Sequence, residues 1–293
     1  MTYSSPDNCK RIKMKFSDEN QALVSSPGGH FISKLGSFGV SLLQELSSMA
    51  LMLGKMISEV GGRIFKHRTP FRLEDLFYQT NRVGVESVPM VVLLSLFVGL
   101  TMALLVGHAL ELYGLVTLVP AVVSMAFSRE LGPLFTGIVL ASRIGAAYTA
   151  ELGAMTAGGE VDAIEGMGIG ALRYLVTPRL LAIFSMTPCL SVISVASGIF
   201  GGALISSLML QLSNGFFYDQ VMTNLVVKDM MTGMAKSFLF GAIIGIIACY
   251  RGLAVRGGAI GVGIATTSSV VTAVSTVIAC DSLCNIFIVL FFP

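Results

Sequence analysis

Apolar and polar positions alternate in long blocks along this chain, and the apolar blocks from residue 88 onward have the length of membrane spans. The first block, 88–110, contains no Asp, Glu, Lys or Arg. About 20 apolar residues in a helix cross roughly 30 Å of hydrocarbon. We therefore expect transmembrane helices at about 88–110, 131–152, 180–212, 232–250 and 266–292. The pattern predicts an all-α integral membrane protein with about five spans.

The second apolar block, 116–152, is too long for one straight transmembrane helix. Its 37 residues would reach about 55 Å at 1.5 Å per residue. Gly132-Pro133 is the natural break, because proline removes a backbone donor and clashes with the preceding turn. We expect a short segment that ends near Arg129, followed by a span from Leu131.

The residues before the first span divide into two regions. Residues 1–35 are polar and predict a flexible tail without a cleavable signal sequence. Residues 36–82 predict an amphipathic helix at the membrane interface and a basic connector, because Leu42, Leu46, Met49 and Leu53 recur at helical spacing. The transmembrane domain is then 83–293.

Composition supports a membrane protein and gives its orientation. Hydrophobic residues make up 54% of the chain and charged residues 12%, against roughly 25% charged residues in a soluble domain. Eleven of the 19 Lys and Arg residues precede Val83. The positive-inside rule therefore places the amino end in the cytoplasm, and five spans place the carboxyl end on the opposite side.

A short acidic segment, about 158–168, separates the second and third spans. It carries Glu160, Asp162 and Glu165, together with the apolar Ile164 and Met167. Its glycines limit a helix here to two or three turns. A cytoplasmic helix at this place is where a transporter would bind a soluble motor, so we interpret it as a coupling helix.

Several ionisable residues lie inside or at the edges of the apolar blocks, namely Arg129, Glu130, Arg143, Glu151, Lys236 and Asp281. Such a residue costs roughly 2.5–3.5 kcal/mol at a helix centre and usually has a function. Arg143, Glu151 and Lys236 could instead extend toward the water boundary, and Arg129-Glu130 could be a structural pair there. The Asp281 side chain is too short, and its position in the span too central, to reach the water boundary. We expect it to meet a cation or water. The candidate transport residues are Arg129, Glu130, Lys236 and Asp281.

Enzymatic motifs are absent from the sequence. It contains no G-x-x-x-x-G-K-[ST], no H-E-x-x-H and no G-x-S-x-G, so we expect no catalytic residue, no bound cofactor and no ATP hydrolysis by this chain. Cys280 and Cys284 lie one helical turn apart, but no nearby His or third Cys completes a metal site.

The order and spacing of these motifs resemble one family, the MlaE (YrbE) permeases. The resemblance covers about 38–292 and is carried by Arg129-Glu130-Leu131-Gly132-Pro133, Ser142-Arg143-x-Gly145, Thr149-Ala150-Glu151-Leu152-Gly153, Glu160–Gly168 with Pro178-Arg179, Gly257–Thr267 and Asp281. Gly170-Ala171 departs from the family pattern, where a proline-containing turn is frequent.

The resemblance implies the permease subunit of an MCE-type ABC system that moves phospholipids between membranes. It implies two copies of the chain, a separate ABC ATPase, a periplasmic MCE-domain protein and no nucleic acid. It implies the bacterial inner membrane, with relatives in the plastid envelope, and a periplasmic carboxyl end. Glu160–Met167 would be the helix that binds the ATPase.

Two other functions remain open at this point. An ion-coupled secondary transporter could use Glu130, Lys236 and Asp281 as a relay, and its transport would follow a proton gradient rather than ATP. A non-transporting membrane scaffold would purify without bound lipid.

Overall fold

The computed structural model describes residues 73–168 and 170–291. The chain divides into two compact units, Met1–Leu51 and Met52–Pro293, and every described residue belongs to the second unit. The expected tail 1–35 and most of the expected interfacial region 36–82 lie outside the described residues.

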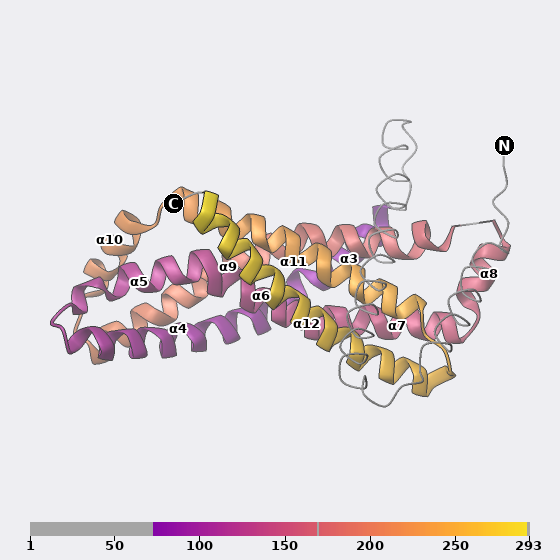
Figure 1. Ribbon diagram of the computed structural model, residues 1–293, viewed down its shortest axis with the longest axis horizontal. Helices are drawn as coiled ribbons and strands as arrows, with labels where there is room; N and C mark the ends of the chain where they lie inside the picture. The colour runs from indigo at the N-terminus through magenta and orange to yellow at the C-terminus, as the bar shows by residue number, and fades with distance from the viewer. Residues whose placement is uncertain (1–72, 169, 292–293) are drawn as a thin grey trace, which may run out of the picture. The chain divides into compact units, whose positions relative to one another are not determined.

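Helices form nearly the whole described part of the chain, and no strand occurs in that part (Figure 1). It contains five helical regions long and apolar enough to cross a membrane, at Glu74–Glu111, Val116–Ala157, Tyr174–Met209, Val227–Leu253 and Gly258–Leu290. The helices that form them are α3 (Leu73–Val83), α4 (Val88–Glu111), α5 (Val119–Ala126), α6 (Gly132–Leu140), α7 (Ala146–Ala157), α9 (Thr177–Met209), α11 (Val227–Leu253) and α12 (Gly258–Phe291). The all-α membrane fold with five spans is therefore confirmed.

The second span differs from the expected break at Gly132-Pro133. The backbone stays helical from α5 through α6 to α7, joined by two π-helical turns, η3 (Phe127–Leu131) and η4 (Ala141–Gly145). Pro133 occupies the first turn of α6. A π-helical turn inserts one extra residue, so the proline ring follows a widened turn and does not end the helix. The 42 residues of this region reach roughly 63 Å, so its ends extend beyond the hydrocarbon.

Small residues let α9 lie close to α4. A Cβ added to Gly99 would lie 2.0 Å from the carbonyl oxygen of Gly198, and one added to Gly201 would lie 2.4 Å from that of Leu96. Ser95 and Ser194 share a hydrogen bond of 2.6 Å across the same contact. In lipid, the hydrophobic effect does not drive helices together. Close packing of this kind stabilises their association instead.

A short helix, α10 (Asn214–Asn224), connects the third and fourth spans and was not among the expected elements. Its Phe217 and Val221 are buried against Val123 and Phe127 of the second span and Ile199 of α9. Figure 1 shows α10 at one end of the helix bundle, next to α5.

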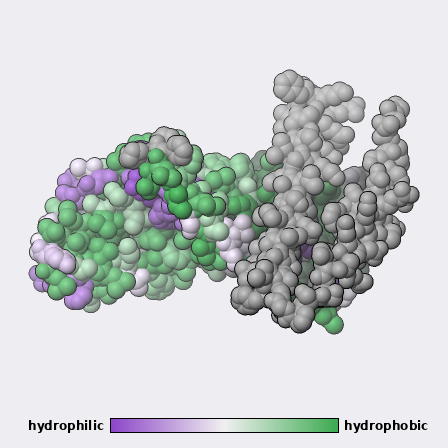
Figure 2. Space-filling model, viewed as in Figure 1, coloured by the Kyte–Doolittle hydropathy of each residue, from purple (hydrophilic) through white to green (hydrophobic). Residues whose placement is uncertain are grey.

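The surface of the described helices is largely apolar. Figure 2 shows hydrophobic residues over most of their visible face, with hydrophilic patches near the end that carries α10. Leu93 and Leu105 of α4 and Val289 of α12 are more than half exposed. An apolar exterior is typical of helices that contact lipid.

Candidate functional site

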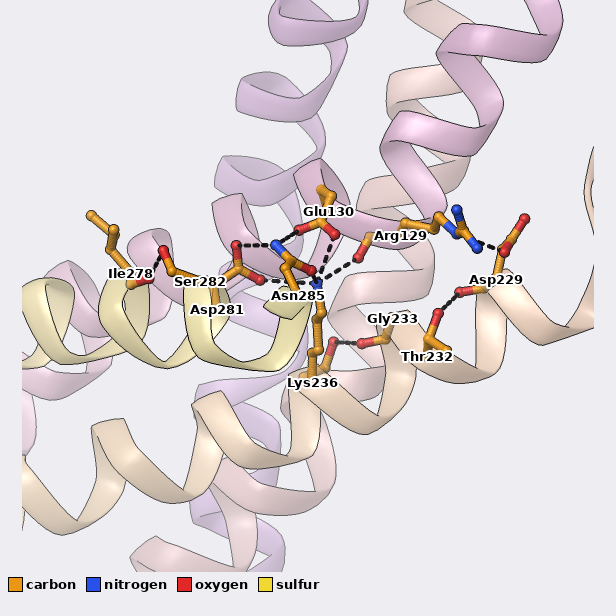
Figure 3. A network of polar contacts seen from close by, with 11 residues as sticks. Arg129, Glu130, Asp229, Thr232, Gly233, Lys236, Ile278, Asp281, Ser282 and Asn285 are labelled. Atoms are coloured by element: carbon orange, nitrogen blue, oxygen red, sulfur yellow. Dashed lines mark hydrogen bonds and ion pairs between the residues drawn. The ribbon is translucent and has the colours of Figure 1, made fainter. Parts of the chain in front are cut away.

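Lys236 of α11 lies at the centre of a buried polar cluster formed by three spans (Figure 3). Only 2% of the residue is exposed. Its Nζ lies 2.8 Å from Glu130 Oε1 and 3.1 Å from Asp281 Oδ1, and it also donates to Asn285 Oδ1. A buried ammonium needs such partners, because an unpaired charge in a low-dielectric interior is costly.

Asn285 of α12 joins the two carboxylates. Its Nδ2 donates to Glu130 Oε2 at 3.0 Å and to Asp281 Oδ2 at 3.5 Å. Asp281 and Asn285 are four residues apart, so both face the same side of α12. One ammonium therefore faces two carboxylates across the second, fourth and fifth spans, and an amide holds the carboxylates in place.

The π-helical turn η3 brings Glu130 to Lys236. Pro133 has no backbone N–H for the carbonyl four residues earlier, that of Arg129, and Lys236 Nζ donates to this oxygen at 3.3 Å. Gly233 lets α11 approach the same turn, since an added Cβ would lie 2.1 Å from the carbonyl oxygen of Ser128. The Gly-Pro sequence and Gly233 thus position the ion cluster.

Arg129 turns away from this cluster and pairs with Asp229 in the first turn of α11. Its Nε donates to Asp229 Oδ1 at 2.7 Å. Asp229 is 4% exposed, whereas the Arg129 side chain is 41% exposed. Adjacent residues of one turn therefore contact α11 at two points, seven residues apart.

A groove of about 610 Å³ opens between α11 and α12 beside the ion cluster. Its lining is mostly apolar: Met231, Ala235, Leu239, Leu283, Phe287 and Ile288, with Thr232, Cys280, Cys284, Lys228 and Lys236. Ligand sites of this size commonly combine apolar walls with a few polar groups. The groove can accommodate a hydrocarbon chain along the helices and an anionic group near an ammonium.

The acidic segment forms α8 (Glu160–Gly166) between the second and third spans, as a single short helix. Glycines with positive φ bound it, Gly159 at +76° and Gly168 at +77°. Glu160, Asp162 and Glu165 are exposed, Ile164 is half-buried, and Met167 is 68% exposed just after the helix. α8 packs against the end of α7, and its charged face is open for a partner.

The remaining charges expected in the membrane, Glu151 and Arg143, have partners on other spans. Glu151 of α7 accepts from Arg82 of α3 and from Arg179 Nη2 of α9, the latter at 3.3 Å. Arg143 donates to Ser87 Oγ at 2.6 Å and to Glu86 Oε2 at 3.0 Å. These pairs tie the start of the first span to the second and third spans.

The structure brings together three of the four candidate transport residues, Glu130, Lys236 and Asp281, and pairs the fourth, Arg129, elsewhere. The expected cation beside Asp281 is Lys236. Sequence reasoning missed Asp229 and Asn285. The spacing of Asn285 from Asp281 could have indicated it, whereas nothing local marks Asp229 as the partner of Arg129. Within residues 73–168 and 170–291, no group of three or more His, Cys, Asp or Glu residues could hold a metal ion.

Known proteins similar to this chain identify its family. Residues 76–287 match the family model of permease MlaE. A probable ABC transporter permease protein of Synechocystis sp. is 34% identical over 229 residues, which cover 77% of this chain and 87% of that protein. The Arabidopsis thaliana protein TRIGALACTOSYLDIACYLGLYCEROL 1, chloroplastic, is 34% identical over 225 residues, 77% of this chain and 64% of that protein. A probable ABC transporter permease protein of Rickettsia typhi is 33% identical over 204 residues, 70% of this chain and 79% of that protein. The chain therefore belongs to the MlaE permease family and is a multi-pass membrane permease subunit of the ABC transporter type.

Proposed function

We propose that this permease moves phospholipids or related lipids between membranes, driven by ATP hydrolysis on a separate subunit. The observation that carries the proposal is the groove between α11 and α12, whose mostly apolar lining includes Lys236. A phospholipid has the same division into apolar tails and a charged headgroup. The name of the Arabidopsis relative also refers to a lipid.

In this proposal the groove holds the tails and the ion cluster meets the headgroup. Leu239, Leu283 and Phe287 would contact the hydrocarbon. A phosphate near Lys236 would compete with Glu130 and Asp281, which already share the ammonium. Because the lysine already has two carboxylate partners, a headgroup phosphate would gain little net binding free energy there. A small gain suits a substrate that must be released.

The proposed partners are those that the family resemblance implies. The exposed acids of α8 would bind an ABC ATPase, and the groove would be completed by a second copy of the chain. An MCE-domain protein would receive or deliver lipid on the periplasmic side. The proposed location is the bacterial inner membrane, with the amino end cytoplasmic and the carboxyl end periplasmic.

The proposal is tested by filling the groove. Leu283→Trp should block ATP-dependent transfer of a fluorescent phospholipid between vesicles that contain the permease and its ATPase. Leu105→Trp is the control, since Leu105 is 69% exposed on α4 and does not line the groove. Transfer that follows a proton gradient without ATP would favour the ion-coupled transporter. A complex that neither transfers nor retains lipid would favour the scaffold.

A further inference from the structure

A second, smaller pocket lies between α3 and the start of the third span. The residues that line it are distant in sequence from those that line the groove. The pocket has a volume of about 150 Å³ and is lined by Asp75, Tyr78, Gln79, Tyr174, Leu175, Pro178 and Arg179. One water needs only about 10–15 Å³ of such space, so the pocket has room for a larger polar group. Unlike the groove, it is lined mainly by polar side chains.

Two residues that line this pocket each carry a buried polar atom without a protein partner. Arg179 Nε and Gln79 Oε1 make no hydrogen bond to any described residue, although the two residues are only 8% and 9% exposed. A buried donor or acceptor without a partner is costly, because it has lost its hydrogen bond to water. One unpaired donor and one unpaired acceptor in the same pocket indicate a ligand that carries both functions.

Contacts hold the guanidinium of Arg179 through two of its nitrogens, and Nε is the one left without a partner. Its Nη1 donates to the carbonyl of Leu175 at 3.0 Å and its Nη2 to Glu151 at 3.3 Å. The guanidinium carbon lies 5.8 Å from the centre of the Tyr148 ring. Because these contacts fix the plane of the group, the remaining N–H has a fixed direction.

The charges around the pocket complement a zwitterion. Glu151 is shared by Arg82 and Arg179, so the two arginines keep one positive charge in excess. Asp75 supplies a negative charge at the pocket wall. A phosphate can accept from Arg179, and an ammonium can donate to Asp75 and Gln79.

We propose that this pocket binds a phosphate ester with a neighbouring ammonium, the chemistry of a phosphoethanolamine headgroup. Its source is a lipid of the leaflet next to α8. Phe77 and Tyr78 of α3 are 72% and 66% exposed beside the pocket. Exposed aromatic side chains at the end of a membrane span are typical of headgroup depth. The site is separate from the α11–α12 groove and does not rest on lipid transport through it.

The chain contains no tryptophan, so one introduced at the pocket is a specific probe. Tyr174→Trp in the purified full-length chain should change fluorescence saturably with dihexanoylphosphatidylethanolamine. Gln79→Leu and Arg179→Gln in this background should each raise the Kd at least tenfold. Arg256→Gln, which removes an exposed arginine outside the pocket, should leave the Kd unchanged.

Two further probes identify the source of the ligand. O-Phosphoethanolamine should bind at least tenfold more weakly than the lipid, and dihexanoylglycerol should not compete. Equal binding of O-phosphoethanolamine would keep the headgroup chemistry but overturn the lipid source. No saturable response to either phosphate ester, an equal response to dihexanoylglycerol, or an unchanged Kd in Gln79→Leu would overturn the site and leave water as its occupant. Each of these results is independent of transport, so failure here leaves the proposed function standing.

Discussion

The Lys236 ammonium donates to the backbone carbonyl of Arg129, the oxygen that Pro133 leaves without its usual helical donor. The same ammonium forms ion pairs with both Glu130 and Asp281. One side chain thus stabilises both an irregular backbone turn and two membrane-embedded carboxylates. Replacement of this lysine should therefore lower the stability of the fold before it changes the binding of substrate.

Lys236→Met should lower the free energy of unfolding by about 3–5 kcal/mol, because removal of one partner leaves buried charges uncompensated. Thermal unfolding in detergent measures the change. Lys228→Met is the matched control, since Lys228 is an exposed lysine in the first turn of the same helix. Adding Glu130→Gln and Asp281→Asn to Lys236→Met should restore much of the loss. A triple variant as unstable as the single one would contradict the ion-cluster explanation.

The two carboxylates should be partly redundant for folding but not for transport. Glu130→Ala and Asp281→Ala should each reduce lipid transfer several-fold more than expression, because Lys236 keeps one counter-ion in either variant. Asp281→Asn should be milder than Asp281→Ala, since an amide can still accept from Lys236. Transfer in reconstituted vesicles, normalised to assembled complex, measures both. Full activity of both alanine variants would assign these residues to packing.

The number of spans and the intramembrane charges could be read from the sequence, but the contacts between spans could not. Apolar runs fix where helices cross, and the cost of charge in lipid singles out Glu130, Lys236 and Asp281. The pairing of Arg129 with Asp229 depends on how α11 is rotated, which one sequence does not specify. The helix through Gly132-Pro133 was missed because a π-helical turn has no reliable sequence signal and yet relieves the proline clash.

Gly233→Ala should test the close approach of α11 to the π-helical turn η3. The added Cβ would lie 2.1 Å from the Ser128 carbonyl oxygen, and neither backbone can move away without disturbing the ion cluster. We expect a loss of about 1–3 kcal/mol, typical of overpacking, seen as a lower midpoint of thermal unfolding. Gly263→Ala in α12 is the control, because nothing lies within 4 Å of its added Cβ. Equal midpoints for the two variants would show that the helices are not in contact there.

Membrane orientation can be tested at two exposed loops. In intact cells, a membrane-impermeant thiol reagent should label a cysteine at Tyr113, after α4, but not one at Arg256, before α12. Tyr113 is 77% exposed and Arg256 is exposed, and both avoid the neighbouring glycines Gly114 and Gly257, whose positive φ favours glycine. The native cysteines other than buried Cys249 are replaced by serine beforehand. The reverse labelling pattern would overturn a cytoplasmic amino end.

Charge reversal on α8 should separate ATPase binding from membrane insertion. Glu160 and Glu165 are exposed on a helix that packs against the end of α7, so their replacement by lysine disturbs no buried contact. If the ATPase offers a basic groove, like charges then meet across the interface and disfavour it by several kcal/mol.

The expected result for Glu160→Lys with Glu165→Lys is at least a tenfold loss of co-purified ATPase and a matching loss of lipid transfer, with normal amounts of inserted permease. Glu111→Lys with Asp219→Lys is the matched control, because it reverses two exposed acids at the opposite end of the bundle. Undiminished ATPase on the α8 variant would refute charge pairing at this helix. Ile164→Ala with Met167→Ala would then test whether apolar contact, through the half-buried Ile164 and the exposed Met167, holds the ATPase instead.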